Sequence, residues 1–191
     1  MTTVYFVRHA FSDKTVRDDR TRPLTAEGLA DSENVAELLK NRNIDIIISS
    51  PYKRSIDTVG SLARALNKEI ITDEAFRERN AGNWFGENFL EFIEKQWADF
   101  NYHIPEGESL ASVQERNIGA LRKVLAEHGG KNIVIATHGT ALSTIINYFD
   151  RDYNFKSFMR ILNFMPYVVK MEFDGERFLG MSEELVINKN W

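Results

Sequence analysis

Two arginines and two histidines stand at the ends of predicted strands in this chain. Arg8-His9 follows the apolar run Val4–Val7, and Thr137-His138-Gly139 ends a second β-rich run. Ser49-Ser50-Pro51, with Arg54 three residues further on, ends a third. Because the carboxyl ends of parallel strands lie at one edge of an α/β sheet, we expect these side chains to meet in one crevice. Guanidinium groups around an imidazole predict a phosphoryl-binding pocket that contains a nucleophile.

The imidazole of His9 suits attack on phosphorus. When one ring nitrogen donates its hydrogen to a backbone carbonyl, the other nitrogen of a neutral imidazole is free to attack. Nearby arginines lower the pKa of such a ring by charge repulsion, and Arg8 and Arg54 can hold phosphoryl oxygens through paired, charge-assisted bonds. A cationic His138 can stabilise the charge that builds on those oxygens. Taken singly, each of these residues is equally well explained as an ordinary surface or core side chain.

The composition limits the partners. The chain has 191 residues, of which 43% are hydrophobic and 27% charged, with a formal net charge of -4. That charge argues against a nucleic-acid partner, although a few buried cations still suffice for an anionic substrate. The absence of cysteine excludes disulfides and thiolate chemistry and fits a cytoplasmic location. The chain begins directly in a strand pattern, and no apolar run approaches the ~20 residues of a membrane helix, so no membrane partner is expected.

Strand and helix patterns alternate along most of the chain. Strands are predicted at residues 3–8, 44–48, 70–71 and 132–137, and helices from Thr25, over 56–66, over 85–100, over 109–127 and after 139. This alternation predicts a three-layer α/β/α fold with a mainly parallel central sheet. Asp174-Gly175, between the runs 167–173 and 176–181, predicts a hairpin of antiparallel C-terminal edge strands. No linker divides the chain, so we expect a single domain over residues 1–191.

Six motifs occur in order between residues 3 and 173. They are Arg8-His9-Ala10, the Pro23–Gly28 element, Ser49-Ser50-Pro51 with Arg54 and Thr58, the Phe76–Gly82 segment, Gly107-Glu108-Ser109 with Arg116, and His138-Gly139. In this order and at this spacing they resemble the histidine phosphatase superfamily, the phosphoglycerate mutase-like proteins. An isolated Arg-His pair would be weak support, but six ordered elements are strong support. The resemblance implies a phosphoglycerate mutase-like fold.

The resemblance also implies a role for individual residues. His9 is the nucleophile that becomes phosphorylated, and Glu78 protonates the leaving oxygen and then deprotonates the attacking water. The phosphoryl group is bound by Arg8, Arg54 and His138, with the backbone at Gly139 close by. The other interpretation of Glu78 is an exposed carboxylate that pairs with Arg77 or Arg79.

Departures from the family pattern concern the substrate side of the pocket. Phe11 stands where Glu or Gln is common, and Thr15 stands where many members have Asn, while Ala10 replaces a glycine. An apolar substrate contact or simple packing then replaces a polar contact at Phe11. The aromatic stripe over 85–100 is best explained as core, yet it occupies the position of the family's variable cap. Our candidates for contacts with the leaving group are Phe11, Ser12, Thr15, Trp84, Phe85 and Tyr102.

The remaining polar residues favour no further site. His128 stands at a predicted helix end, and His103 is best explained as a surface residue. Arg17, Arg20 and Arg22 are best explained as part of a solvated surface loop. The alternative is that these cations bind a second anionic group of a doubly charged substrate. No His, Asp or Glu cluster has metal-ligand spacing, so neither a metal nor a cofactor is predicted.

The leading hypothesis is therefore a cofactor-independent phosphatase that acts on a small phosphorylated substrate. A mutase that moves phosphate between hydroxyl groups is the second hypothesis, and an inactive relative that binds a phosphorylated ligand is the third. The identity of the substrate and the oligomeric state are not encoded in any motif that we can interpret.

Overall fold

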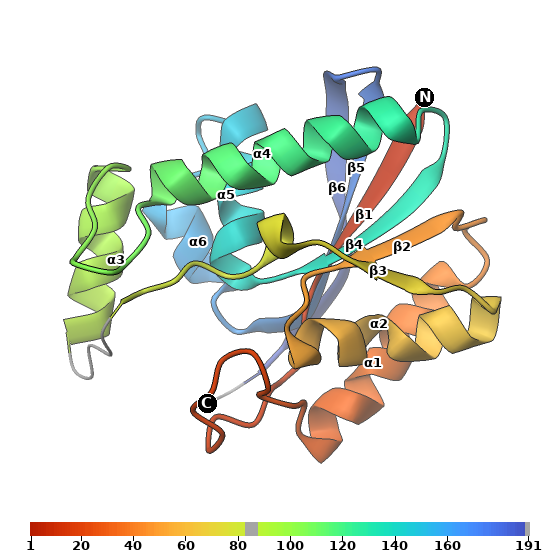
Figure 1. Ribbon diagram of the computed structural model, residues 1–191, viewed down its shortest axis with the longest axis horizontal. Coiled ribbons are helices and arrows are strands. Elements are labelled where there is room, and N and C mark those ends of the chain that lie inside the picture. The colour runs from red at the N-terminus through yellow and green to blue at the C-terminus, as the bar shows by residue number, and fades with distance from the viewer. Residues whose placement is uncertain (83–87, 190–191) are drawn as a thin grey trace.

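A six-stranded sheet with the order β3-β2-β4-β1-β5-β6 forms the centre of the molecule in the computed structural model, which describes residues 1–82 and 88–189 (Figure 1). The strands are β1 (Thr2–Arg8), β2 (Ile46–Ser49), β3 (Ile70–Thr72), β4 (Asn132–Thr137), β5 (Phe164–Asp174) and β6 (Arg177–Asn188). The first four are parallel, whereas β5 runs antiparallel to β1, and β6 antiparallel to β5. The predicted mainly parallel sheet with antiparallel C-terminal strands is confirmed.

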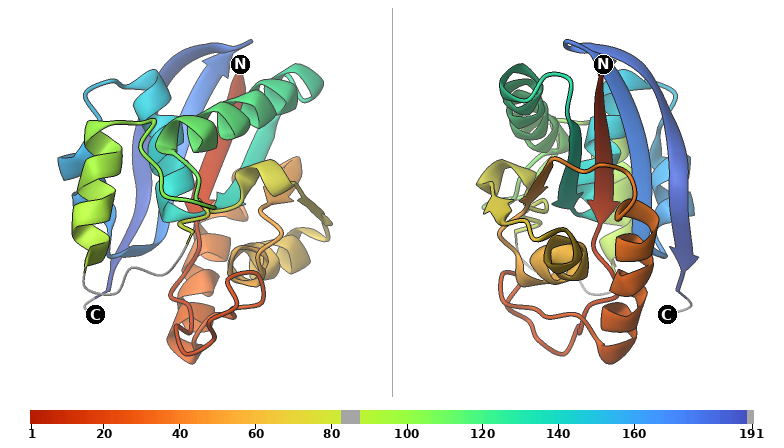
Figure 2. Two further views of the ribbon diagram at one scale, coloured as in Figure 1. Left: turned by 60° about the vertical axis from the view of Figure 1, so that its left-hand side comes forward. Right: turned by 90° about the vertical axis from the view of Figure 1, so that its right-hand side faces the viewer.

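Helices cover both faces of this sheet. They are α1 (Ala26–Leu39), α2 (Lys53–Leu66), α3 (Phe89–Ala98), α4 (Leu110–Glu127), α5 (Gly139–Phe149) and α6 (Phe155–Ile161), with a short 3-10 turn η1 (Glu74–Phe76). The first two pack on one face, and α4, α5 and α6 pack on the other (Figures 1 and 2). Consecutive strand residues alternate between the two cores, because side chains of a strand point to opposite faces. Phe6 accordingly joins one core and Tyr5 the other, which confirms the three-layer α/β/α architecture.

Local signals place the starts of two helices. Thr25 caps α1 by accepting a hydrogen bond from the Gly28 backbone N–H at 3.0 Å, and Ser109 caps α4 in the same way from Ser112 at 3.1 Å. A side-chain oxygen at this position satisfies a backbone donor that the first helical turn leaves unpaired. Both caps agree with the predicted helix starts.

Three elements differ from the sequence-based expectation. The helix α6 was not predicted, since its seven residues are too few to show a clear helical period. Strand β6 continues to Asn188 rather than ending near residue 181, because its alternation of exposed and half-buried positions extends along the whole edge. The aromatic helix α3 begins at Phe89, and its predicted start at residue 85 lies outside the described residues.

The carboxyl ends of β1, β2 and β4 lie side by side. Arg8 pairs with Thr137 in the β1–β4 register, and Ser49 pairs with Ala136 in the β2–β4 register. The chain segments that follow these strands therefore start at one edge of the sheet. The loop over residues 9–25 extends beyond that edge, toward the lower part of Figure 1. Among the described residues no helix is long and apolar enough to cross a membrane.

Candidate phosphoryl-binding site

His9 directly follows β1 and is almost fully buried. Its Nδ1 lies 2.7 Å from the carbonyl oxygen of Ala10, to which it donates its hydrogen, so Nε2 is the nitrogen without a proton. Burial, followed by the charges of Arg54 and Arg8, lowers the pKa of His9 well below its usual range. The ring is consequently neutral near pH 7, which is the form that can attack phosphorus. The predicted arrangement of a carbonyl-held imidazole is thus present, with burial as the larger cause of its neutrality.

The guanidinium of Arg8 is held from an unexpected direction. It donates hydrogen bonds to the carbonyl oxygens of Ile161 and Leu162, at the carboxyl end of α6. Its Nε is buried and has no partner among the described residues. A Cβ on Gly139 would lie only 3.0 Å from the Arg8 Cζ, so any side chain at this position would require the guanidinium to shift away from the backbone. Burial lowers the pKa of Arg8 to about 10, and the charge of Glu78 partly opposes that shift.

Arg54 enters the same region from the first turn of α2. Its side chain is buried, donates to the Asp19 carbonyl oxygen, and pairs with the Asp19 carboxylate at 3.1 Å. Its guanidinium carbon lies 5.0 Å from the centre of the Tyr52 ring. Thr58, one turn along α2, donates to the Arg54 carbonyl at 2.7 Å and accepts from the Ala10 N–H at 2.9 Å. Thr58 thereby joins the backbone after His9 to the helix that carries Arg54.

His138 is completely buried beside His9. Its Nε2 lies 2.8 Å from the Ser50 Oγ and 3.2 Å from the Ser55 Oγ, whereas its Nδ1 has no partner among the described residues. Burial, followed by Arg54 and the His9 ring, lowers the pKa of His138 well below its usual range. A cationic form of His138 is the one expected to stabilise phosphoryl charge. In this environment that form requires compensating negative charge, which a phosphoryl dianion would supply.

Glu78 approaches from the segment after η1. Its Oε2 accepts the Thr140 N–H at 3.0 Å, and its Oε1 accepts the Ala141 N–H at 3.1 Å and the Arg79 N–H at 2.8 Å. Because the first turn of α5 leaves its N–H groups unpaired, the carboxylate acts as a cap supplied from another part of the chain. Among the described ion pairs, none joins Glu78 to the side chain of Arg77 or Arg79, which was the alternative interpretation.

The predicted substrate-contact residues have diverse environments. The Phe11 carbonyl accepts from the Thr25 N–H at 3.0 Å, and a Cβ on Gly28 would lie 2.1 Å from that carbonyl oxygen, so Phe11 ties the loop to α1 through its backbone. Ser12 is buried and forms an isolated bridge with Leu24. Thr15 is exposed, and its hydroxyl donates to the Asp13 carboxylate at 2.7 Å.

The aromatic candidates lie further along the chain. Tyr102 packs against Phe92 of α3, with ring centres 6.0 Å apart, and no described contact joins it to His9. Trp84 and Phe85 lie outside the described residues. All six assignments to the substrate remain predictions.

The other cationic and histidine residues behave as ordinary loop and surface groups. Arg20 pairs with Glu74 of η1, and Arg22 pairs with Asp19 of the loop itself. Lys14 is exposed, and partial desolvation together with the charges of Arg22 and Arg8 lowers its pKa to about 8. Outside this loop, His103 is exposed and its Nδ1 contacts the Ile104 carbonyl, while His128 ends α4.

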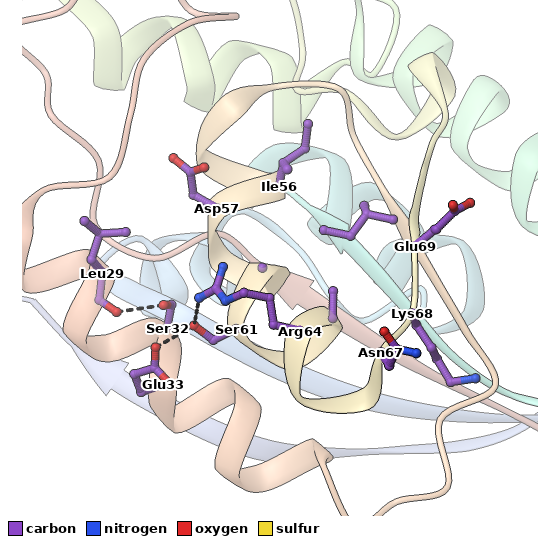
Figure 3. A pocket seen from close by; sticks show the side chains of 13 residues that line it. Leu29, Ser32, Glu33, Ile56, Asp57, Ser61, Arg64, Asn67, Lys68 and Glu69 are labelled. Carbon is purple, nitrogen blue, oxygen red and sulfur yellow. Dashed lines mark hydrogen bonds between the residues drawn. The ribbon is translucent and has the colours of Figure 1, made fainter.

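One groove on the surface is separate from this constellation. This groove, of about 810 Å³, lies between α1, α2 and β3, and none of Arg8, His9, Arg54, Glu78 and His138 lines it (Figure 3). Three of its polar side chains form a chain of hydrogen bonds: Arg64 donates to the Ser61 Oγ at 2.7 Å, and Ser61 donates to Glu33. No group of three or more potential metal ligands occurs in the part of the chain that the structure describes. The convergence of side chains, rather than this groove, therefore identifies the candidate site.

Several residues of the site were not given a role from sequence. Ser50, Thr58 and Arg116 belong to the quoted motifs, so their spacing could have pointed to them. Ser55, Asp19 and the α6 carbonyls carry no such signal, because their contacts with the site join residues 35 to 154 positions apart.

The site places two arginines and two histidines at the carboxyl edge of a mainly parallel sheet, and the match to a phosphatase family together with phosphatase homologues indicates a phosphatase enzyme. The chain belongs to the histidine phosphatase superfamily (branch 1), whose pattern it matches over residues 4–182. It is 33% identical over 123 residues to phosphoserine phosphatase 1 of Hydrogenobacter thermophilus, covering 60% of this chain and 58% of that protein. It is 31% identical to the uncharacterized phosphatase PhoE of Bacillus subtilis, covering 76% of each.

Solved structures share the fold of this chain. YhfR of Bacillus stearothermophilus superposes with a TM-score of 0.77 at 25% identity, covering 94% of this chain and 95% of that chain. Phosphoserine phosphatase of Entamoeba histolytica, solved with 3-phosphoglyceric acid, has the same fold, with a TM-score of 0.80 at 23% identity over 97% of this chain and 98% of that chain. The predicted phosphoglycerate mutase-like fold is confirmed.

Proposed function

We propose that this protein hydrolyses phosphomonoesters of small molecules through a phosphohistidine intermediate on His9. The observation that carries the proposal is the state of the His9 ring: Nδ1 donates to the Ala10 carbonyl at 2.7 Å, so Nε2 is the unprotonated nitrogen of a buried, neutral imidazole. Arg8 and Arg54 supply the positive charge that holds a phosphoryl group in front of it.

In the first step, the Nε2 lone pair of His9 forms a bond to phosphorus as the bond to the leaving oxygen breaks. Glu78 gives its proton to that oxygen, and the product alcohol departs. In the second step, Glu78 takes a proton from water, the water oxygen bonds to phosphorus, and the bond to Nε2 breaks. His138 and the two arginines stabilise the charge on the equatorial oxygens in both steps.

The substrate we propose is a small phosphorylated metabolite. Support comes from two relatives whose names specify phosphoserine phosphatase. Lys14, whose pKa is lowered to about 8 by partial desolvation and by Arg22 and Arg8, is one cation near this pocket that can meet a second anionic group of such a substrate.

Phosphate release tests the proposal. We expect the purified protein to release phosphate from 4-nitrophenyl phosphate and from at least one member of a panel that includes O-phosphoserine and 3-phosphoglycerate. A rapid alkaline denaturing quench should trap a phosphoenzyme that is stable in base, is lost in acid and is absent in His9→Ala, while His103→Ala, which removes an exposed histidine, serves as the matched control. Wild-type turnover in His9→Ala would refute the assignment of the nucleophile.

A mutase reaction is the second candidate, because a relative from Proteus mirabilis that is 30% identical over 159 residues is named a probable phosphoglycerate mutase. A mutase uses the same groups but returns the phosphoryl group to a second hydroxyl. Conversion of 3- to 2-phosphoglycerate that depends on a bisphosphate primer, and that outpaces phosphate release, would favour this reaction over hydrolysis.

A further inference from the structure

The side chains of Arg116 and Glu108 form a half-buried ion pair at the start of α4. The Arg116 Nε donates to the Glu108 Oε1 at 3.0 Å, and the Arg116 Nη2 donates to the Oε2 at 3.2 Å. Each side chain is only 18% exposed. This two-point geometry fixes the orientation of both groups, which a single contact between flexible side chains would not do.

Arg116 also donates hydrogen bonds to the backbone of the segment that carries Glu78. Arg116 Nη1 donates to the carbonyl oxygens of Ala75 at 2.6 Å and Arg77 at 2.9 Å, and Nη2 donates to the carbonyl oxygen of Glu78 itself at 3.2 Å. These three carbonyls lie at the end of η1 and just beyond it. One guanidinium thus supplies hydrogen-bond donors for most of that turn.

Glu108 holds the other side of the segment. Its carboxylate accepts the Asn80 N–H at 2.8 Å and two hydrogen bonds from the Arg77 guanidinium, at 2.9 and 3.2 Å. The Glu108 N–H in turn donates to the Asn80 carbonyl at 2.8 Å. The backbone on both sides of Glu78 is therefore attached to the first turns of α4.

The carboxylate of Glu78 is attached to a different helix. It accepts N–H groups of Thr140 and Ala141 in α5, directly after His138. Glu78 consequently bridges α4, which holds its backbone, and α5, which holds its carboxylate. Movement of the backbone would have to displace the carboxylate relative to the His9 Nε2.

We propose that Arg116 and Glu108 are positioning residues that set where the Glu78 carboxyl group lies relative to the leaving oxygen of the substrate. The inference rests on the proposed function, because it requires Glu78 to be the general acid. Neither residue touches the reacting atoms, so their effect passes through Glu78. A displacement of about 1 Å is enough to reduce the rate by up to about a hundredfold.

The dependence of rate on the leaving group separates this role from a general structural one. A poor leaving group such as phenoxide needs a proton from Glu78, whereas 2,4-dinitrophenolate departs readily as an anion. The series of phenyl, 4-nitrophenyl and 2,4-dinitrophenyl phosphate varies this need while the binding surface changes little. The ratio kcat/KM is the right measure, since it reports the steps up to phosphorylation of His9 and not the later hydrolysis.

We expect Arg116→Met and Glu108→Gln each to lower kcat/KM for phenyl phosphate about thirtyfold and for 2,4-dinitrophenyl phosphate less than about threefold. Arg116→Lys should remain impaired on phenyl phosphate, because an ammonium group cannot supply the same fork of donors. In a Glu78→Gln background, Arg116→Met should cause no further change in the leaving-group dependence. Arg122 lies on the same helix as Arg116 and forms an exposed ion pair with Glu176 in the turn between β5 and β6. Arg122→Met, which removes this pair, is the matched control.

An equal loss across the three esters in both variants, or an additive effect on top of Glu78→Gln, would overturn the inference. Glu108→Gln keeps the shape of the side chain, so it covers the case in which Arg116→Met fails to fold, and thermal unfolding reports that failure. If Glu78→Gln itself leaves the leaving-group dependence unchanged, the proposed function of Glu78 is refuted and the positioning role falls with it. Wild-type protein that forms no phosphoenzyme would instead refute the proposed function as a whole.

Discussion

The imidazole rings of His9 and His138 meet edge to face, with their centres 5.3 Å apart and their planes at 63°. They come from the ends of neighbouring strands, β1 and β4, and both are buried among arginines. Two adjacent imidazoles in such a place cannot both accept a proton without a negative charge between them. The burial of these two neutral rings therefore makes the free energy of unfolding depend on pH.

The first prediction concerns stability against pH. Burial lowers the pKa of both His9 and His138 in the folded state, so the unfolded chain binds more protons below the ordinary histidine value of about 6.5. The stabilising contribution is complete above that pH and is lost as the pH falls toward the folded-state values. Each ring should lower the free energy of unfolding by about 1.4 kcal/mol per pH unit in that window.

Urea unfolding at pH 7.5, 6.5 and 5.5 measures this slope. His138→Gln should remove one ring's share of the slope, whereas His103→Gln, which replaces an exposed histidine, should leave it unchanged. If the slope of His138→Gln equals that of the wild type, His138 is not the source of the pH dependence.

The second prediction concerns the close approach of Gly139 to Arg8. In Gly139→Ala the added Cβ would lie 3.0 Å from the Arg8 Cζ, and the guanidinium is held by the Ile161 and Leu162 carbonyls, so it has little room to yield. We expect KM for phosphate esters to rise about tenfold, equivalent to about 1.4 kcal/mol of binding. Steady-state kinetics on 4-nitrophenyl phosphate provides the measurement.

Gly119→Ala is the matched control for this substitution. A Cβ at Gly119 meets no atom within 4 Å, and the residue lies in the interior of α4. That variant should keep wild-type kinetics and gain about 0.5–1 kcal/mol of stability from its better helix propensity. A wild-type KM in Gly139→Ala would mean that Arg8 does not contribute to phosphoryl binding from its observed position.

The third prediction concerns the carboxylate of Asp19. It lies 3.1 Å from the Arg54 guanidinium and therefore opposes the approach of an anion to that group. Asp19→Asn removes the negative charge, while the Asp19 backbone carbonyl, which also accepts from Arg54, is retained. We expect the inhibition constant of inorganic phosphate to fall about threefold in the variant, because a repulsive charge is removed. The change is modest because the carboxylate is half-exposed and its charge is partly screened.

Competition against 4-nitrophenyl phosphate gives the inhibition constant. Asp57→Asn, which changes the net charge equally but belongs to an ion pair with Lys53 on α2, should show the wild-type value. Weaker inhibition of Asp19→Asn would show that the carboxylate orients Arg54 more than it competes with the anion.

Residue pattern and spacing alone predict the layered sheet and most of the residues brought together at its edge. Apolar β-rich runs specify β1, β2 and β4, and their ends coincide with Arg8, Ser49 and Thr137. Since parallel strands end at one edge, the chain position of His9, Arg54 and His138 was enough to predict their meeting. The ordered motifs added Glu78, whose segment lies outside the sheet.

The hydrogen bonds that hold these groups could be found only in the folded chain. Arg8 is fixed by carbonyls of Ile161 and Leu162, more than 150 residues away, from a helix too short to be predicted. Glu78 is fixed by α4 and α5 together, and the neutral state of His138 follows from complete burial. Side-chain periodicity reports which residues are buried, but hydrogen bonds between distant segments and the desolvation of a charge depend on packing, which exists only once the layers have assembled.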